Sequence, residues 1–593
     1  MQGLLEYPFD AALVLKKKKG IRRWQKEENK EYIKKNIAIL GGSTTSEVKD
    51  ILELFLLNYG IEPVFYESEY GQFWQDAVFG NAALDAFGPD LVYIHTSNRN
   101  ILNYPAMENT PGEAEEILLS EYRRFSSMWE KLREKYRCPI IQNNFEMPFY
   151  RLLGNKEASD IHGKIYFLTR LNLLFYEYAQ SADGFYINDI NYLSASYGLE
   201  HWSEPKYWYM YKYCLCIPAI PYLAFNLSNI IKSVYGKNKK ALVLDLDNTL
   251  WGNIIGEDGT GGIEIGHETP MGQAYSEFQG YIKGQKSLGV ILAINSKNEM
   301  GNALAGLHHP DSTLCPDDFI VIKANWEPKD RNFLAISKEL NILPDSMVFL
   351  DDSPTEREIV RRQVPGAAVP ELYSIEGYIR IVDRSGFFEQ TVISEDDAKR
   401  NVMYQQNRQR EELGQSFQNY GDFLRSLKME AVIREFEPVY YARIAQLTNK
   451  SNQFNLTTKR FTEAEISGFA AQKEYICLYG KLSDKFGDNG VVTVVIGRQE
   501  EEVLHIELWL MSCRVLKRGM EDAILDELVK KAGRRGICRL KGYYYKTAKN
   551  AMVKDFYQCF GFKKLSENTD GDSEWILELA GYQEKNHKIK ITN

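Results

Sequence analysis

The chain has 593 residues, a net charge of −9 and a pI near 5.7. A chain of this length is expected to divide into three or four domains. The acidic balance argues against a nucleic-acid-binding protein, which would present a basic surface. No apolar run approaches the roughly 18 residues of a membrane span, and the N-terminal stretch lacks the order of a signal peptide. The eight cysteines are scattered without a CxxC pair, so we expect free thiols in the cytoplasm.

Residues 36–235 alternate strand-like and helix-like segments. The strand-like segments are NIAILGG, PVFYESEY, DLVYIHTS, PIIQNNF and DGFYINDI. This rhythm predicts a flavodoxin-like parallel sheet covered by helices. We expect a first domain over 1–235, with a helical extension at its N-terminus.

A second α/β unit is expected over 236–394, with strands in ALVLDLD, VILAINS, FIVIKA and MVFLDDS. Residues 395–428 are polar and without a strand signal, which predicts a helical connector. A third unit of α+β type is expected over 429–585. It contains a hairpin formed by GVVTVVIGR and EVLHIELWLMS, and a helix with a buried stripe at Met520, Ile524, Leu528 and Ala532. The tail EKNHKIKITN is expected to be mobile.

Four polar elements follow successive strands of the second unit. They are the pair Asp245 and Asp247, then Ser296, then Lys329, then the pair Asp351 and Asp352. Because the carboxyl ends of parallel strands share one edge of a sheet, these side chains are expected to converge. Carboxylate oxygens are the ligands that Mg²⁺ prefers, so the sequence predicts a Mg²⁺ site held by Asp245, Asp247, Asp351 and Asp352.

The chemistry suggests a role for each residue. Asp245 is expected to attack phosphorus, and Asp247 to protonate the leaving oxygen and then activate the incoming nucleophile. Ser296 is expected to hydrogen-bond a phosphoryl oxygen, and Lys329 to supply a fixed positive charge. A structural alternative remains for each motif taken singly, since aspartates also cap helices and form turns.

The four ordered motifs resemble the haloacid dehalogenase (HAD) superfamily. The resemblance implies a Rossmann-like domain that hydrolyses or transfers phosphoryl groups with Mg²⁺. The gaps between the motifs leave no room for a large cap domain. We interpret GEDGTGG, at 256–262, as a flap and turn.

The first unit resembles the SGNH hydrolase fold, with Ser43 after the first strand and Asn98 after a later one. That fold also requires a late Asp-x-x-His pair. Here Glu204 replaces the aspartate and Tyr207 stands where the histidine belongs, while His201 has the wrong offset. The favoured interpretation is therefore Ser43 as a helix N-cap in a non-hydrolytic scaffold, and hydrolysis by Ser43 is the alternative.

The loop CRVLKRGME follows a strand and opens a helix, where backbone N–H groups suit a pyrophosphate or phosphopantetheine. Together with NAMVKDFYQCFGF it resembles the GNAT acyltransferase fold. The resemblance implies binding of coenzyme A or a carrier-borne phosphopantetheine, although Lys517 replaces the family's first glycine. The expected cofactor-binding residues are Arg514, Arg518, Gly519, Asn550 and Tyr557.

The strand before that loop is expected to alternate, with Leu504, Ile506, Leu508 and Leu510 on one face. His505, Glu507 and Trp509 are expected on the other, polar face, where His505 or Glu507 is either a general base or part of a solvated surface. Cys513, beside Arg514 and a helix N-terminus, is either an activated thiol or an inert buried one.

The order of the three units, with the phrases DLDNTLWG, NWEPKDRN, LDDSPTERE, LTNKSNQFNLTTKRF, DKFGDNG and MSCRVLKRGME, is similar to the FkbH family of HAD-IIIC proteins. The resemblance implies that 1,3-bisphosphoglycerate loses phosphate and that a glyceryl group is held as an enzyme thioester. The group then passes to the phosphopantetheine thiol of an acyl carrier protein. By this analogy Cys513 is the candidate acyl-carrying thiol.

Two other functions remain open at the level of the sequence. The chain could be a HAD phosphatase of a small phosphometabolite fused to a GNAT N-acyltransferase that uses acetyl-CoA, in a surface-polysaccharide or secondary-metabolite pathway. It could also be a non-catalytic scaffold in a biosynthetic assembly, but the complete set of carboxylates argues against that.

Overall fold

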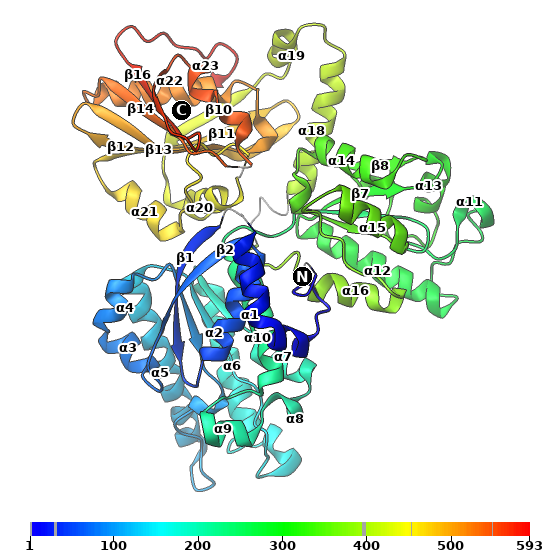
Figure 1. The fold of residues 1–593 in the computed structure, drawn as a ribbon, viewed down its shortest axis with the longest axis vertical. Coiled ribbons are helices and arrows are strands. Elements are labelled where there is room, and N and C mark those ends of the chain that lie inside the picture. The colour runs from blue at the N-terminus through cyan, green and yellow to red at the C-terminus, as the bar shows by residue number, and fades with distance from the viewer. Residues whose placement is uncertain (1–2, 29–31, 394–398, 452, 548, 593) are drawn as a thin grey trace. The chain divides into compact units, whose positions relative to one another are not determined.

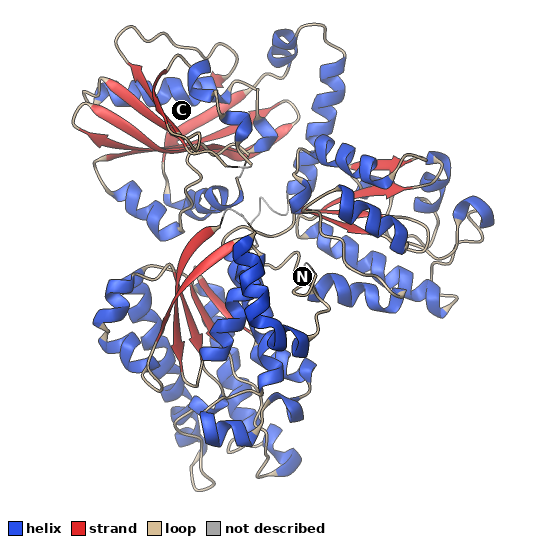
Figure 2. Ribbon diagram, viewed as in Figure 1, coloured by secondary structure: helices blue, strands red, loops and turns tan. Residues whose placement is uncertain are grey.

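The computed structural model describes residues 3–28, 32–393, 399–451, 453–547 and 549–592. The chain forms two compact units, Met1–Val234 and Tyr235–Asn593. The first contains one β-sheet and the second contains two, as Figures 1 and 2 show. None of the described helices combines the length and apolar character needed to cross a bilayer.

The first unit is built on a five-stranded parallel sheet with the order β2-β1-β3-β4-β5. Its strands are β1 Ile33–Gly41, β2 Ile61–Glu67, β3 Leu91–His95, β4 Ile140–Asn143 and β5 Phe185–Asn188. Its helices are α1 Ala11–Glu27, α2 Ser46–Asn58, α3 Phe73–Phe79, α4 Ala82–Phe87, α5 Pro111–Tyr136, α6 Lys164–Ser181, α7 Ile190–Tyr197, α8 Leu199–Trp202, α9 Pro205–Tyr211 and α10 Ile220–Val234. Helices lie on both sides of this sheet in Figure 2.

The core of this unit is aromatic where α5 and α6 meet the sheet. The rings of Phe125, Trp129, Phe175 and Phe185 contact one another at centroid distances of 4.7 to 5.3 Å. Helix α5 begins at a capping box in which Thr110 and Glu113 satisfy each other's backbone N–H groups. This packing holds the carboxyl ends of β1, β3 and β4 as one rigid edge.

The second unit begins with a four-stranded parallel sheet of order β8-β7-β6-β9. The strands are β6 Ala241–Leu244, β7 Ile291–Ser296, β8 Val321–Ala324 and β9 Met347–Leu350, and every residue of β6, β7 and β9 is buried. The helices are α11 Ile255–Asp258, α12 Pro270–Ser287, α13 Met300–Leu307, α14 Lys329–Leu340, α15 Pro354–Gln363 and α16 Ile375–Arg384. Fully apolar strands are the pattern of a parallel sheet covered on both faces.

The rest of the unit surrounds an eight-stranded mixed sheet of order β15-β16-β14-β13-β12-β11-β10-β17. Its strands are β10 Glu430–Glu435, β11 Tyr475–Asp484, β12 Gly487–Glu500, β13 Val503–Met511, β14 Arg539–Tyr544, β15 Lys563–Glu567, β16 Ser573–Glu578 and β17 Lys590–Ile591. Its helices are α20 Tyr441–Lys450, α21 Glu463–Ala471, α22 Met520–Arg534 and α23 Phe556–Cys559. The stripe expected on α22 is fully buried at Met520, Ile524, Leu528 and Ala532.

Two helices join the sheets of the second unit, α18 Arg400–Gln415 and α19 Tyr420–Ser426. Of the expected helical connector, residues 395–398 lie outside the described residues. Arg410 of α18 makes a bidentate ion pair with Asp484 at the end of β11, with N···O distances of 2.7 and 2.8 Å. Both side chains are buried, so this pair ties the connector to the eight-stranded sheet.

The predicted fold class, a multidomain α/β chain with parallel sheets and a final α+β unit, is confirmed. Two local expectations are wrong. The tail is not free in the described residues, since β17 pairs with β10 and Ile589 is buried. The expected alternation of side chains along β13 also fails, because the side chains in the second half of the strand point to the opposite face from the one expected.

A β-bulge causes that change of face. Gly497 of β12 pairs with Ile506, but Ile496 pairs with Leu508, so Glu507 is the extra residue. As a result Leu508 belongs to a different apolar cluster from Ile506, and Trp509, expected on the polar face, is fully buried.

The buried ion pair yields a stability prediction. Asp484→Ala leaves the guanidinium of Arg410 buried without its carboxylate, so we expect a loss of about 3–5 kcal/mol in the unfolding of the second unit. Glu412→Ala is the matched control, because its pair with Arg408 on the same helix is exposed and is expected to contribute below about 1 kcal/mol. Urea unfolding of both variants measures the difference, and equal losses would contradict the assignment.

A second prediction concerns pH and the first unit. Glu146, just after β4, is completely buried, and burial raises the pKa of its carboxyl from 4.5 to about 7. Between these values the unfolded chain releases a proton that the folded chain keeps. Stability from this group is therefore present below pH 4.5 and falls, by about 3 kcal/mol, as the pH rises to about 7.

The Glu146→Gln variant is expected to lose that part of the pH dependence, whereas Glu116→Gln, at an exposed position on α5, is expected to keep it. Unfolding of the first unit measured from pH 4.5 to 7.5 tests this. Parallel stability curves for wild type and Glu146→Gln would refute the shift.

Candidate active sites

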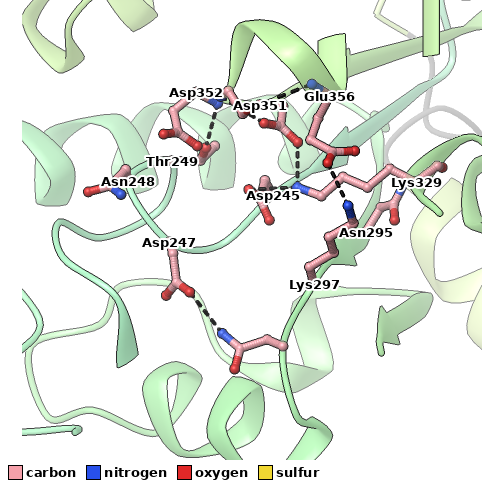
Figure 3. A network of polar contacts seen from close by, with 12 residues as sticks. Asp245, Asp247, Asn248, Thr249, Asn295, Lys297, Lys329, Asp351, Asp352 and Glu356 are labelled. Atoms are coloured by element: carbon pink, nitrogen blue, oxygen red, sulfur yellow. Dashed lines mark hydrogen bonds and ion pairs between the residues drawn. The ribbon is translucent and has the colours of Figure 1, made fainter. Parts of the chain in front are cut away.

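The carboxyl end of β6 carries the two aspartates that the sequence singles out. Asp245 follows the last residue of β6, and its backbone N–H donates to the carbonyl of Leu350 at 3.0 Å, which ties it to β9. Asp351 and Asp352 follow β9, so the adjacent parallel strands bring three carboxylates together. One oxygen from each of Asp245, Asp351 and Asp352 lies within 4.8 Å of the others (Figure 3).

A buried lysine compensates part of this negative charge. The Nζ atom of Lys329 lies 2.7 Å from Oδ2 of Asp245 and also contacts Oδ2 of Asp351. Burial alone would lower the pKa of Lys329, but the two carboxylates raise it, so the ammonium remains charged. Asn295 of β7 donates to the carbonyl of Lys329 at 2.8 Å and holds the start of α14 in place (Figure 3).

The remaining charge favours a cation. Burial raises the pKa of Asp351 and of Asp352, and the charge of Asp245 adds to the effect. Oδ1 of Asp245 is buried and has no hydrogen-bond partner among the described residues. An acceptor oxygen in that state, beside two more carboxylates, fits a divalent cation with oxygen ligands. The three aspartates are therefore the residues that would hold a metal.

Asp247 lies apart from this cluster. Its Oδ1 accepts from the indole of Trp251 at 2.8 Å and from the N–H of Ile255 at 3.2 Å, and its Oδ2 accepts from Asn298 at 3.0 Å. The Asp247 side chain is therefore not part of the cluster formed by the other three aspartates, since these three donors occupy both of its oxygens. Burial raises the pKa of Asp247, which suits a group that delivers a proton.

Ser296 is buried as the last residue of β7. Sequence reasoning missed Asn298, two residues further on, although a polar residue following a strand end was a usable signal. It also gave no role to Arg357, which is buried on α15 and donates to the carbonyls of Asp351 and Asp352, both at 2.7 Å. Arg357 holds the turn that presents the two aspartates.

The SGNH-like site of the first unit differs from its expectation. Ser43 is not a helix N-cap, since α2 begins at Ser46 with Thr45 as its cap residue. Instead the buried hydroxyl of Ser43 donates to Sγ of Cys214 at 3.3 Å. Asn98 donates to the carbonyls of Glu146 and Met147.

Glu204, at the place of the SGNH aspartate, and Tyr207, at the place of the histidine, are not among the described hydrogen-bond partners of the Ser43 hydroxyl, and neither is His201. Glu204 caps α9 through the N–H of Lys206, Tyr207 lies on α9, and His201 is exposed on α8. The imidazole near Ser43 is that of His95, at the end of β3, whose Nε2 lies 3.4 Å from Sγ of Cys214. Neither His95 nor Cys214 was identified from the sequence.

In the eight-stranded sheet, β13 and β14 pair over only four residues, from Val503 with Arg539 to Ile506 with Gly542. Beyond the bulge the chain segment 454–456 hydrogen-bonds to β13 and to Tyr545, the residue that follows β14. Leu456 donates to Trp509 at 3.1 Å, and Tyr545 donates to Leu456 at 2.9 Å. The backbone groups exposed by the diverging strands are thus satisfied by the chain itself.

Two of the expected cofactor residues are buried in this region, and one of them, Asn550, supports that segment. Asn550 is fully buried and its amide donates to the carbonyls of Asn455 and Tyr545 at 3.1 and 2.8 Å. Tyr557 is also buried, and its ring lies where a side chain at Gly542 would be, 2.4 Å from an added Cβ. Both side chains are therefore enclosed by the protein, and neither is exposed at its surface.

The loop after β13 has a strained backbone. Lys517 has φ +64° and Gly519, the cap residue of α22, has φ +87°. The left-handed region is unfavourable for lysine, whereas glycine adopts it freely. Arg518 is buried and is held by Asp484 at 3.4 Å and Asn407 at 2.8 Å, and burial lowers its pKa to about 10.

A cavity of about 110 Å³ opens beside this loop. Its lining is rich in basic residues, namely Lys240, Arg400, Arg443, Lys450 and Arg514. Burial, with the nearby cations, lowers the pKa of Lys450 well below its usual value. Ser512 and Arg514 line the cavity on either side of Cys513, whose side chain lies outside the described residues. The basic lining is suited to an anionic group.

Glu507 and His505 are both engaged by neighbours. Glu507 pairs with Arg498 at 2.8 Å and Lys459 at 3.4 Å. His505 contacts the hydroxyl of Tyr543 at 2.6 Å, and burial lowers its pKa. Neither Glu507 nor His505 is among the residues that line the cavity.

A family model described as FkbH, N-terminal domain, matches residues 36–232. No curated protein matches the chain. The ribosomal-protein-S18-alanine N-acetyltransferase of Escherichia coli is 15% identical, over 26% of this chain and 99% of that one, with a TM-score of 0.21. The putative acetyltransferase yncA of Salmonella typhimurium, solved with acetyl-CoA, is 14% identical, over 26% and 96%, with a TM-score of 0.21.

A stronger match is the N-terminal part of BF1531 from Bacteroides fragilis, which contains a phosphatase domain complexed with Mg. It is 30% identical, the match covers 63% of this chain and 99% of that chain, and the TM-score is 0.59. Together with the family model and the converging aspartates, this similarity shows that the chain belongs to the FkbH family and is a phosphatase-type enzyme of the HAD superfamily.

Proposed function

We propose that the chain removes phosphate from 1,3-bisphosphoglycerate or a similar acyl phosphate and transfers the glyceryl group to the thiol of an acyl carrier protein. The observation that carries the phosphoryl half is the cluster of Asp245, Asp351 and Asp352 around the ammonium of Lys329. The acyl half rests on the family resemblance and on the basic cavity beside Cys513.

In the phosphoryl half, the carboxylate of Asp245 attacks the phosphorus of the ester phosphate, and the bond from that phosphorus to the leaving ester oxygen breaks; the acyl phosphate is kept for the acyl half. Asp247 gives that oxygen a proton, then takes one from the water that releases phosphate from Asp245. Lys329 offsets the charge that accumulates on the phosphoryl oxygens. Mg²⁺ held by the three aspartates would supply further neutralisation of that charge.

In the acyl half, a thiol sulfur attacks the acyl carbon, the bond from carbon to the phosphate oxygen breaks, and the thiol proton leaves with the phosphate. The product is a thioester on the enzyme, for which Cys513 is the candidate. The carrier's phosphopantetheine thiol then takes the acyl group. Its phosphate would bind the basic lining, which includes Arg514 and Lys450.

The alternative, a phosphatase fused to an acetyl-CoA-dependent N-acyltransferase, is less well supported. The segment 454–456 fills the gap between β13 and β14, and Lys517 occupies a position unfavourable for a side chain.

All seven described cysteines are free thiols, which suits a reducing compartment such as the cytoplasm.

The metal site yields a prediction that does not depend on substrate. Because a ligand that binds only the folded state stabilises it, MgCl₂ is expected to raise the unfolding temperature of the second unit. Asp352→Asn removes one carboxylate and is expected to lose most of that rise. Glu327→Gln, an exposed position near Lys329, serves as the control and should respond like wild type. An undiminished response in Asp352→Asn would contradict the proposed ligand set.

The reaction itself is tested by intact-protein mass spectrometry after incubation with 1,3-bisphosphoglycerate and Mg²⁺, with phosphate release measured in parallel. We expect a glyceryl-sized mass gain in wild type that Cys513→Ala loses. Asp245→Asn is expected to slow release of the ester phosphate by roughly 10³-fold or more, since it removes the nucleophile. Glu327→Gln is again the control.

Each outcome discriminates between the functions. A mass gain that survives Cys513→Ala moves the thioester to another thiol. Phosphate release without any adduct would refute acyl transfer and leave a phosphatase.

A further inference from the structure

The loops at the carboxyl edge of the four-stranded sheet contain one basic residue, Lys297. These loops are 245–254 after β6, 297–299 after β7, 325–328 after β8 and 351–353 after β9. Lys329, which starts α14, is buried against the aspartates, whereas the side chain of Lys297 is 40% exposed. An anionic substrate that approaches this edge therefore meets one accessible cation in the loops.

The partner of Lys297 is Glu356, on the first turn of α15. Nζ of Lys297 lies 2.6 Å from Oε1 of Glu356 (Figure 3). Because β6 lies between β7 and β9, an ion pair that joins the loop after β7 to the helix after β9 spans the end of β6. Strands two positions apart are separated by about 10 Å, which a lysine side chain helps to bridge. The pair therefore lies over the mouth of the site that contains Asp245.

The register of the strands places Lys297 outside the carboxylate cluster. Leu244 pairs with Ile294, so Asp245 is level with Asn295, and Lys297 lies two residues, roughly 7 Å, further out. The buried strands close the inner side of the site, so the rest of a substrate whose phosphate contacts Asp245 must extend outward. Lys297 is thus positioned to meet a second group of the substrate and not the phosphoryl group that is transferred.

The pair with Glu356 can open at little cost. Ion pairs that reach solvent contribute little to stability, and the N-terminus of α15 stabilises the Glu356 carboxylate independently of Lys297. Oε2 of Glu356 is buried and has no hydrogen-bond partner among the described residues, so the pair satisfies this carboxylate only in part. An incoming anion can therefore replace Glu356 at the ammonium of Lys297.

We infer that Lys297 selects substrates that carry a second anionic group, a short carbon chain away from the phosphate that the site removes. On binding, that group displaces Glu356 from the Lys297 ammonium. The inference rests on the proposed function, because it concerns the substrate of the same phosphoryl site. Lys297 is then a specificity-determining residue, and phosphomonoesters without a second charge are weaker ligands.

Two stable probes differ in the second group alone. Glycerol 3-phosphate and 3-phosphoglycerate share the ester phosphate and the three-carbon chain, but the first ends in an alcohol and the second in a carboxylate. Calorimetry with Mg²⁺ measures the Kd of each for the full chain carrying Asp247→Asn, which lacks the proton donor and keeps the three clustered aspartates. We expect 3-phosphoglycerate to bind about 10- to 100-fold more tightly, the range for one charge-assisted hydrogen bond.

Variants of the ion pair test the assignment in both directions. Lys297→Met is expected to abolish the preference without changing the Kd of glycerol 3-phosphate, and Lys297→Arg to restore part of it. Glu356→Gln removes the competing carboxylate, so it is expected to tighten 3-phosphoglycerate by up to about 5-fold. Lys323→Met is the matched control, because Lys323 lies within β8 and pairs with Glu339 of α14.

The inference is overturned if the two probes bind equally, if neither binds, or if Lys297→Met keeps the preference. It is also overturned if Lys297→Met weakens both probes alike, since that result means a structural role. The proposed function fails differently, when the chain with native Asp247 releases no ester phosphate from 1,3-bisphosphoglycerate. A preference that depends on Lys297 in such a chain would support the anion contact and refute the reaction.

Discussion

The ion pair between Lys329 and the aspartates at the end of β6 is the constraint on which the catalytic unit depends. Asp245 and Asp351 are both buried, and adjacent parallel strands hold them together. Without a cation, one of them would have to take up a proton, because like charges in a low-dielectric site repel strongly. Lys329 supplies one positive charge, and Asn295 and Arg357 fix the two turns that carry the charged groups.

Lys329 neutralises only part of the negative charge of the aspartates, and the charge that remains explains why the site can bind a metal ion. One lysine faces three carboxylates, and Oδ1 of Asp245 has no partner among the described residues. Two further fixed positive charges would balance the three carboxylates and close the site to ligands. Leaving the charge unbalanced instead gives a site that gains stability when it binds a metal ion.

The geometry of β6 also constrains the proposed transfer. Asp245 follows the strand, whereas Lys240, which precedes it, lines the basic cavity beside Arg514. Five residues of extended strand span about 16 Å, so the phosphoryl site and the cavity lie at opposite ends of the sheet. An acyl group cannot be handed directly from one to the other. The proposed transfer therefore requires either that the substrate moves from the phosphoryl site to the cavity or that the acyl-carrying thiol lies outside the cavity. Locating the thioester on the chain decides between these two possibilities.

The sequence predicted the HAD-type site well because its determinants are local. Each motif is a polar residue directly after an apolar run, and parallel pairing of those runs brings the motifs together without any further information. The same reasoning failed at Ser43, where the partner of the hydroxyl is 171 residues away. No short-range pattern links Ser43 to Cys214 or Cys214 to His95.

The alternation of β13 failed for a related reason. A bulge at Glu507 shifts every later side chain to the opposite face, and its signal, Gly497, lies on the neighbouring strand. The wrong face for Trp509 has this origin, and the pairing of β13 with β14 ends at Ile506, next to the bulge. Local patterns indicate where strands are, but irregular pairing depends on the partner strand, which a single segment does not contain.

The polar groups at the sheet edges of the two units differ in charge and in how they are stabilised. At β6 the groups are charged, so the site remains dependent on a cation. At β1 and β3 the groups around Cys214 are neutral and satisfy one another, from Ser43 through the thiol and His95 to Asn143. A neutral network has no such dependence, and it becomes charged only when a proton moves along it. The first arrangement suits chemistry on phosphate, whose charge must be neutralised, whereas the second needs no ligand to balance it.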